Sequence, residues 1–264
     1  MKKVLYFLLL VTLWSCSNDK EDTNSSSKSV LVKKLDAVDL GKNASYTFSY
    51  NDTKLDKVAY EIEGQTDGIG HYEYFYTGNL ISEIKQFNQS NQNTARILFE
   101  YNSNNALTQV TELDVNANYG LKNVITYNSD GTVEVDRFSG TAASQSTFAY
   151  SSLFYFQNGE FVQENNSGTI QTIVNYEFDS ANHPLQNVTG INEIKIYSAL
   201  THGLFNRGLM GLNNNLKKQT TFFVADGSTE IVDYTLNYNE QNYPTTIVSS
   251  PTSLGSYSYQ FEYY

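Results

Sequence analysis

Cysteine occurs once in this chain of 264 residues, at Cys16, and proline only three times. A lone cysteine excludes an internal disulfide, and its position in a leader-like segment leaves no thiolate elsewhere for a metal or a nucleophile. Methionine and tryptophan are also scarce, whereas the chain has 21 tyrosines and 15 phenylalanines. Aromatic residues among small polar ones favour strands and turns. We therefore expect an all-β protein stabilised by its own core.

Basic residues are few as well. The chain has 17 lysines and arginines against 28 aspartates and glutamates, for a net charge of -11, and Lys2 and Lys3 lie in the leader. An acidic chain is repelled by nucleic acid and by anionic lipid headgroups, so neither is an expected partner. After the leader, no apolar stretch is long enough for a membrane-spanning helix.

The first residues have the pattern of an export signal. Lys2 and Lys3 precede an apolar run, Val4 to Leu13, which is too short to remain as a spanning helix. Leu13-Trp14-Ser15-Cys16 follows, and this segment resembles the lipobox of bacterial diacylglyceryl lipoproteins. The resemblance implies that residues 1–15 are a signal peptide and that Cys16 is the lipid attachment residue. A palmitate-bearing lipid on Cys16 would make the membrane the first partner.

Residues 16–29 contain no apolar side chain after Cys16, so they cannot bury enough surface to order themselves. They are predicted to form a flexible tether. Asp19, Glu21 and Asp22 resemble the acidic export signal that Bacteroidota lipoproteins carry after the lipidated cysteine. That resemblance implies the outer membrane and its cell-surface face. The alternative is that these acidic residues are ordinary polar residues of a linker and that the domain faces the periplasm.

Residues 30–264 are predicted to form one domain of repeated hairpins. An aromatic-x-aromatic pair, a polar turn and an alternating strand recur about every 25 residues, at Tyr50, Tyr76, Tyr101 and Tyr127. Turn-forming Asn, Asp and Gly residues separate the strands. Each unit is then a β-hairpin. The whole is an antiparallel meander that forms a strongly curved sheet or a soluble barrel-like fold.

One region interrupts this period. Between Phe178 and Tyr238 the spacing exceeds two units, and the excess falls around residues 197–212. Leucines there have helix-like spacing, although three glycines weaken a helix. We expect a short helix or loop insertion near 198–216 that plugs a barrel mouth or covers a sheet edge. A loop that lines a binding cleft is the alternative.

The recurring aromatic-x-Tyr-Asn/Asp pattern is similar to the tyrosine-aspartate repeats of Rhs-type proteins. The lipobox, the acidic tether and the closing segment Tyr257–Tyr264 together make the chain look like Bacteroidota surface lipoproteins of unknown function with such repeats. That resemblance implies a porin-like antiparallel β fold. It brings no assigned activity.

Residues with catalytic chemistry are dispersed. No metal-ligand spacing or nucleophile elbow occurs, and each histidine is expected to be a surface or half-buried ring; they are His71, His183 and His202. Carboxylates two apart on a strand point to one face and could in principle hydrolyse glycosides. Like charges on an exposed strand more often prevent edge pairing. The candidates weighed were Glu61 with Glu63, Glu134 with Asp136, and Glu73. We expect no enzyme, no cofactor and no metal.

Three functions stay open at this point. The first is a non-enzymatic binding or envelope-interaction module for a glycan, a lipid or another envelope protein. The second is a half-open barrel that carries an apolar ligand under the 198–212 insertion, and the third is a glycan-processing enzyme. A packed apolar interior favours the first and an apolar hollow the second. Asn, Gln and Glu on the outward strand faces predict a wall exposed to water and not to lipid.

Overall fold

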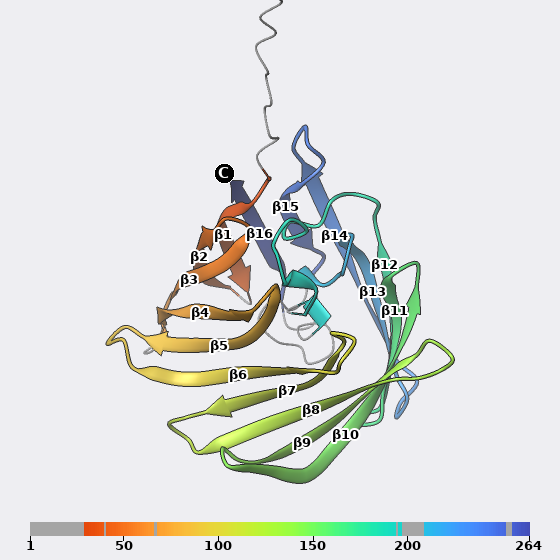
Figure 1. The fold of residues 1–264 in the computed structure, drawn as a ribbon. Helices are drawn as coiled ribbons and strands as arrows, with labels where there is room; N and C mark the ends of the chain where they lie inside the picture. The colour runs from red at the N-terminus through yellow and green to blue at the C-terminus, as the bar shows by residue number, and fades with distance from the viewer. Residues whose placement is uncertain (1–28, 40, 66–67, 194, 197–208, 252–254) are drawn as a thin grey trace, which may run out of the picture.

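The chain forms a closed barrel of sixteen antiparallel strands (Figure 1). The computed structural model describes residues 29–39, 41–65, 68–193, 195–196, 209–251 and 255–264. The predicted signal peptide, most of the predicted tether, Cys16 and His202 lie outside these residues. The strands are β1 (Val32–Asp39), β2 (Lys42–Asn51), β3 (Lys54–Ile62), β4 (Ile69–Thr77), β5 (Leu80–Asn88), β6 (Asn93–Tyr101), β7 (Leu107–Asp114), β8 (Tyr119–Tyr127), β9 (Val133–Thr141), β10 (Ser144–Gln157), β11 (Glu160–Asn166), β12 (Thr172–Phe178), β13 (Leu216–Phe223), β14 (Thr229–Tyr238), β15 (Pro244–Ser249) and β16 (Tyr257–Tyr263).

Each strand pairs with its neighbours in sequence, and β1 closes the ring by pairing with β16. Leu35 of β1 lies opposite Tyr46 of β2 on one side and Phe261 of β16 on the other. The predicted all-β antiparallel meander is therefore confirmed, and it takes the barrel form. Among the described residues, no helix is long and apolar enough to cross a membrane.

The recurring aromatic residues fall at the ends of the even-numbered strands. Tyr101 and Tyr263 end β6 and β16, Tyr50 is the next-to-last residue of β2, and their side chains pack against the buried core. Their hydroxyls donate to carbonyls of the preceding strand: Tyr50 to Val32 at 2.9 Å, Tyr101 to Ile81 at 2.7 Å, and Tyr263 to Pro244 at 2.7 Å. Each bond joins two neighbouring hairpin units, so the repeated aromatic both fills the interior and holds its own unit against the preceding one.

A β-bulge accompanies this aromatic in most hairpins. The register shifts at Ser49/Tyr50, at Phe75/Tyr76 and at Glu100/Tyr101. The extra residue lies on the odd-numbered strand, which bends the strand and increases its twist. Strict alternation would place Gln109 on the face of Leu107 and Val110 on the opposite face. Because of the bulge, Leu107 and Val110 are instead both buried, and Gln109 does not share the face of Leu107.

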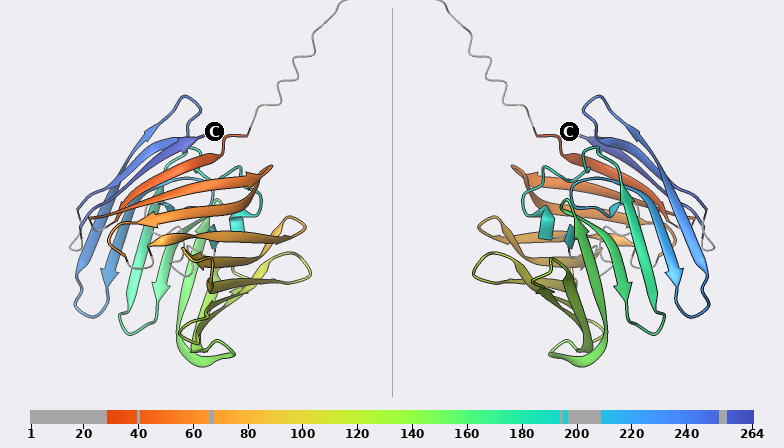
Figure 2. Two further views of the ribbon diagram at one scale, coloured as in Figure 1. Left: turned by 90° about the vertical axis from the view of Figure 1, so that its left-hand side faces the viewer. Right: turned by 90° about the vertical axis from the view of Figure 1, so that its right-hand side faces the viewer.

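The connection between β12 and β13 fills one end of the barrel. Its described part, residues 179–193, 195–196 and 209–215, is called the plug here, and it lies inside the ring of strands in all views (Figures 1 and 2). It contains a short helical segment at 191–193 and 195–196. Leu185, Val188, Ile191, Leu209 and Met210 join the core cluster of the barrel wall.

The plug is longer than the predicted insertion and begins earlier, at Asp179. Residues 197–208 of the predicted insertion lie outside the described residues. Several bonds join the plug to the turns at this end, which we call the plug end. Thr189 N donates to Thr53 O at 2.8 Å, Asn182 N to Asn242 O at 3.0 Å, and Asn187 Nδ2 to Tyr243 Oη at 2.8 Å. The predicted role in closing a barrel mouth agrees with these contacts.

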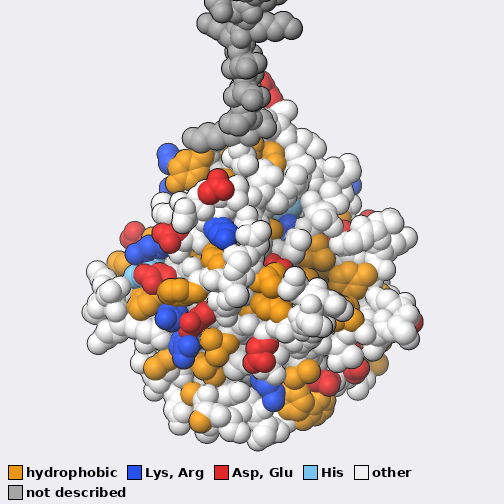
Figure 3. All heavy atoms as spheres, in the orientation of Figure 1, with side chains coloured by type: hydrophobic (Ala, Val, Ile, Leu, Met, Phe, Trp, Pro, Cys, Tyr) orange, Lys and Arg blue, Asp and Glu red, His pale blue; other side chains and the backbone are white. Residues whose placement is uncertain are grey.

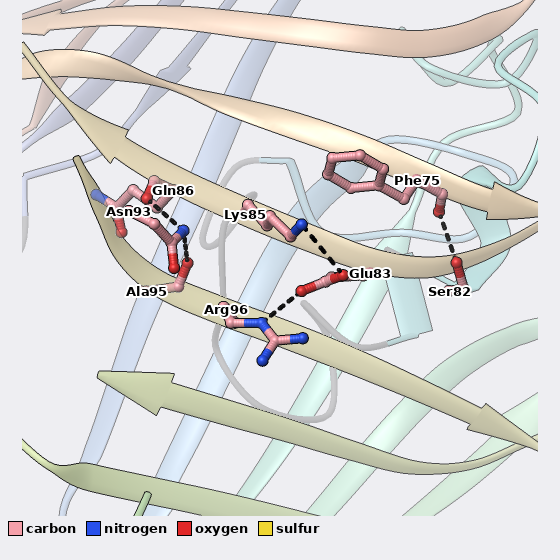
Figure 4. A network of polar contacts seen from close by, with 8 residues as sticks. All are labelled: Phe75, Ser82, Glu83, Lys85, Gln86, Asn93, Ala95 and Arg96. Carbon is pink, nitrogen blue, oxygen red and sulfur yellow. Dashed lines mark hydrogen bonds and ion pairs between the residues drawn. The ribbon is translucent and has the colours of Figure 1, made fainter. Parts of the chain in front are cut away.

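The outward face of the wall carries many charged side chains, together with exposed apolar ones such as Ile69, Phe75 and Ile231. Acidic and basic side chains intermix over β4–β6, on the left in Figure 3. There Glu83 contacts Arg96 (Oε1 to Nε, 2.5 Å) and Lys85 (Oε2 to Nζ, 3.7 Å), while the Lys85 ammonium lies 4.4 Å from the ring centre of Phe75 (Figure 4). Other charged residues alternate with buried ones on further strands: Lys34, Asp36, Glu61, Lys122, Glu134, Asp136, Glu177, Lys218, Asp233 and Glu262.

Candidate functional site

The interior divides into an apolar half and a polar half. Towards the plug end it is filled by side chains such as Phe48, Phe154, Phe161, Ile81 and Leu216, all of which are fully buried. Towards the opposite end, the far end, the inward-facing positions change to Gln86, Glu112, Asn123, Arg137, Ser152 and Thr221. The polar half is therefore the part of the lumen with binding chemistry.

A hollow of about 390 Å³ lies at the far end over β4–β8. Its polar and aromatic lining comprises Tyr72, Gln86, Arg96, Glu112, Asp114 and Tyr119. Gln86 donates to Tyr60 Oη at 2.8 Å, and Tyr60 and Tyr72 rings lie 5.1 Å apart. Flat aromatic faces beside carboxylates and amides form a lining that suits a ligand rich in hydroxyl groups.

Next to this hollow lies a buried cluster around Arg137. Val133, Val135 and Arg137 alternate on the inward face of β9, so Arg137 is only 7% exposed. Arg137 Nη1 donates to Tyr150 Oη, and the guanidinium lies 4.8 Å from the Tyr150 ring centre. Its Nε and Nη2 make no hydrogen bond within the described part of the chain. Asn123 lies directly opposite Arg137 on β8.

Glu164 on β11 and Tyr176 on β12 continue the cluster along the neighbouring strands of the wall. Both are buried, and Tyr176 Oη donates to Glu164 Oε2 at 3.3 Å. Burial and the Glu164 carboxylate raise the pKa of Tyr176, whereas the nearby Arg137 charge acts in the opposite direction. Tyr176 thus stays a neutral hydrogen-bond donor at physiological pH.

A second buried polar group holds the plug. The Glu160 carboxylate accepts the backbone N–H groups of Leu212, Asn213 and Asn214 at 2.7, 2.6 and 2.7 Å. Lys195 Nζ donates to Leu212 O. Burial lowers the pKa of Lys195 to about 7, and Glu160 opposes this shift. This group is structural, because its bonds end on the plug backbone.

His183 also lies in the plug, and it is fully buried, where we expected a surface or half-buried ring. Leu185 N donates to His183 Nδ1 at 3.2 Å, so Nδ1 is the acceptor and Nε2 donates to Leu209 O at 3.2 Å. Burial, with the Lys195 charge, lowers the pKa of His183 well below its usual value. A neutral imidazole with both nitrogens bonded is a structural residue.

A larger hollow, about 880 Å³, lies against the outward face of β15, β16 and β1–β3. Asp36, Glu61 and Glu63 line it. Lys34 Nζ lies 2.7 Å from Asp36, and Asn43 Nδ2 donates to Glu63 at 2.6 Å. Because two of these carboxylates are bonded to surface neighbours, we place the candidate site in the lumen and not here, although this hollow is larger.

The other sequence-predicted residues lie on the outer wall. Glu134 and Asp136 share one face of β9, as predicted, but it is the outward face, where Ser151 Oγ donates to Asp136. His71 stacks on Phe87 with ring centres 5.0 Å apart, and its Nε2 lies 3.4 Å from Glu73. The structure brings none of these together with the lumen cluster. In the described ranges, no group of three or more His, Cys, Asp and Glu could hold a metal.

Sequence reasoning missed Arg137, and a signal for it was present. In Val133-Glu134-Val135-Asp136-Arg137 the alternation puts Arg137 on the same face as two valines. An arginine on the apolar face of a strand is a buried cation, which requires partners. Which residues of β8 and β10 lie beside Arg137 can be seen only from the strand pairing in the folded protein.

Two solved proteins from Bacteroides have a similar fold. The chain is similar to a porin-like protein from Bacteroides uniformis ATCC 8492, with a TM-score of 0.55 and 12% identity over 88% of this chain and 98% of that one. It is likewise similar to a porin-like protein from Bacteroides vulgatus ATCC 8482, with a TM-score of 0.57 and 14% identity over 89% and 99%. Such identities establish the fold alone, that of a porin-like barrel.

No protein-family profile matches the chain. No curated protein matches it either.

Proposed function

We propose that the protein is a lipid-anchored lipoprotein of the outer membrane, displayed at the cell surface, whose barrel is a non-enzymatic binding module. Residues 1–15 are its signal peptide, Cys16 carries the lipid, residues 16–29 are the tether, and residues 30–264 are the barrel. The porin-like neighbours from Bacteroides support an envelope location.

The charge on the outward face supports anchoring by lipid over insertion of the wall. A membrane-spanning barrel presents an apolar band to the lipid and keeps its polar side chains in the lumen. Here charged side chains point outward from β1, β5 and β14, and half of the interior is apolar. A wall of this kind belongs in water.

One observation carries the binding proposal: the barrel is filled at one end and hollow at the other. The chain enters β1 at the plug end, where Tyr264 N donates to Leu31 O at 3.0 Å. A tether attached there leaves the far-end hollow facing away from the membrane. Tyr72 and Tyr119 in that hollow, beside Gln86 and Glu112, favour a glycan as ligand.

Two experiments test the proposal. Protease treatment of intact cells should remove the wild-type barrel, and Cys16→Ala should abolish incorporation of labelled palmitate. On a glycan array, Tyr119→Ala at the far end should weaken binding, while Tyr127→Ala, a comparably exposed tyrosine at the plug end, should not. Equal loss in both variants, or no glycan binding by the wild type, would contradict the lumen site.

An apolar-ligand carrier is the second candidate. Solvent extraction of the purified protein tests it directly, because a carrier releases bound lipid. Leu185, Val188 and Met210 of the plug pack against the wall where such a ligand would lie. That packing favours the glycan proposal.

A further inference from the structure

Three neighbouring strands direct buried hydrogen-bond donors into one part of the lumen. Asn123 on β8 and Arg137 on β9 are register partners, and Ser152 on β10 pairs with Val135, two residues before Arg137. Side chains opposite or diagonal to one another on a sheet face lie within contact distance. Asn123 is 3% exposed and Ser152 is fully buried.

Each of these side chains has a polar atom with no hydrogen-bond partner. The atoms are Asn123 Nδ2, Ser152 Oγ, and Nε and Nη2 of Arg137, all within the ranges that the structure describes. A buried donor without a partner destabilises the fold by about 1–3 kcal/mol, more when it is charged. Several such donors side by side mark a place built for an acceptor.

The geometry of Arg137 specifies that acceptor. Its Nη1 is held by Tyr150, so the side of the guanidinium that carries Nε and Nη2 faces the lumen without a partner. These two N–H groups are parallel and match the two oxygens of a carboxylate. No carboxylate of the described residues lies within ion-pair distance of Arg137.

We propose that Arg137, Asn123 and Ser152 form a carboxylate-binding site, which makes the ligand of the lumen an acidic one. Arg137 binds both carboxylate oxygens, and Asn123 and Ser152 each donate to one of them. This inference rests on the proposed binding function and names its ligand class. Leu121 lines the far-end hollow two residues before Asn123 on the same face of β8, so the hollow is the route of entry.

A matched pair of sugars tests the site in the intact barrel. Glucuronate and glucose differ only in the carboxylate, and acetate provides the carboxylate without the sugar. Calorimetry should show glucuronate binding more tightly than glucose. Arg137→Gln should weaken glucuronate binding about 10- to 100-fold and leave glucose binding unchanged. Lys218→Gln, on the outer wall and away from the hollow, is the control.

Two milder variants keep the test valid if Arg137→Gln does not fold. Ser152→Ala should weaken glucuronate binding with little change in thermal stability, and Asn123→Asp should weaken it further through charge repulsion. Acetate binding that depends on Arg137, without detectable binding of either sugar, would support the carboxylate site and contradict the glycan proposal. Equal binding of glucuronate and glucose, or no binding of any carboxylate probe, would overturn the inference.

Discussion

Asp179 and Asn215 are joined at both backbone and side chain. Asp179 N donates to Asn215 O at 2.9 Å, and Asn215 N donates to Asp179 Oδ1 at 2.9 Å. Since Asp179 follows β12 and Asn215 precedes β13, the pair closes the neck of the plug. Tyr238 Oη also donates to Asp179 Oδ2.

Asp179→Ala should therefore loosen the plug. It removes the acceptor for Asn215 N and for Ala181 N, which predicts a loss of about 1–3 kcal/mol in the free energy of unfolding. Urea denaturation measures this loss. Asp233→Ala, on the exposed face of β14, should change stability by less than about 0.5 kcal/mol.

Lys195 should make stability increase with pH above neutrality. Its pKa is lowered from 10.5 to about 7 in the folded state, so between these values the unfolded chain binds more protons than the folded one. Stability then rises from about pH 7 to pH 10.5 and falls as the pH drops towards 7. Lys195→Met should flatten this rise in thermal melts across that range. A variant with an unchanged pH profile would contradict the prediction, and Lys218→Met on the outer wall is the control.

The buried tyrosines should make the barrel less stable at alkaline pH. Burial raises the pKa of Tyr76 from 10.0 to about 12, and it raises those of Tyr50 and Tyr101 further. Unfolded tyrosines ionise first, so stability falls as the pH rises above 10. Tyrosinate absorbance should increase together with the loss of β-sheet circular dichroism. If these tyrosines ionised gradually near pH 10 while the barrel stayed folded, the conclusion that their hydroxyls are buried would be wrong.

A pair of adjacent residues tests which face of the wall contacts water. Ile231 is 50% exposed and Val232 is 6% exposed, on opposite faces of β14. Ile231→Lys should change stability by less than about 0.5 kcal/mol in detergent-free buffer. Val232→Lys buries an unpaired ammonium and should destabilise by about 3 kcal/mol or more. Measurable destabilisation or membrane retention caused by Ile231→Lys would point to a lipid-facing wall.

A shortened chain gives an independent check. Residues 29–264 include the whole described barrel. This chain should purify without detergent, since charged side chains lie on many strands of the outer wall. Aggregation that detergent prevents would argue against a wall in water. Purification of the Ile231→Lys chain without detergent would strengthen the conclusion that the wall contacts water.

The hairpin repeats were predictable because each unit is locally encoded. The aromatic pairs at Tyr50, Tyr76 and Tyr101 and the turn residues between them follow from alternation and turn chemistry. Closure of the sheet was not predictable, since it depends on the pairing of β1 with β16, whose residues are remote in sequence. The bulges that bring Leu107 and Val110 to one face also depend on a partner strand.

The candidate site was less accessible to prediction. The polar residues singled out from the sequence, Glu134 and Asp136, were chosen for their spacing, and the fold turns them outward. Arg137, the very next residue, turns inward. Only the fold shows that Asn123 and Ser152 accompany it.

The pairing of β1 with β16 also determines when the barrel can form. The two strands that close the ring are the first and the last to be synthesised. Until β16 is available, β1 has an unpaired edge, which is prone to aggregation. The ring can therefore close only after nearly all of its strands have been made, and the edge of β1 stays open for the whole of that interval.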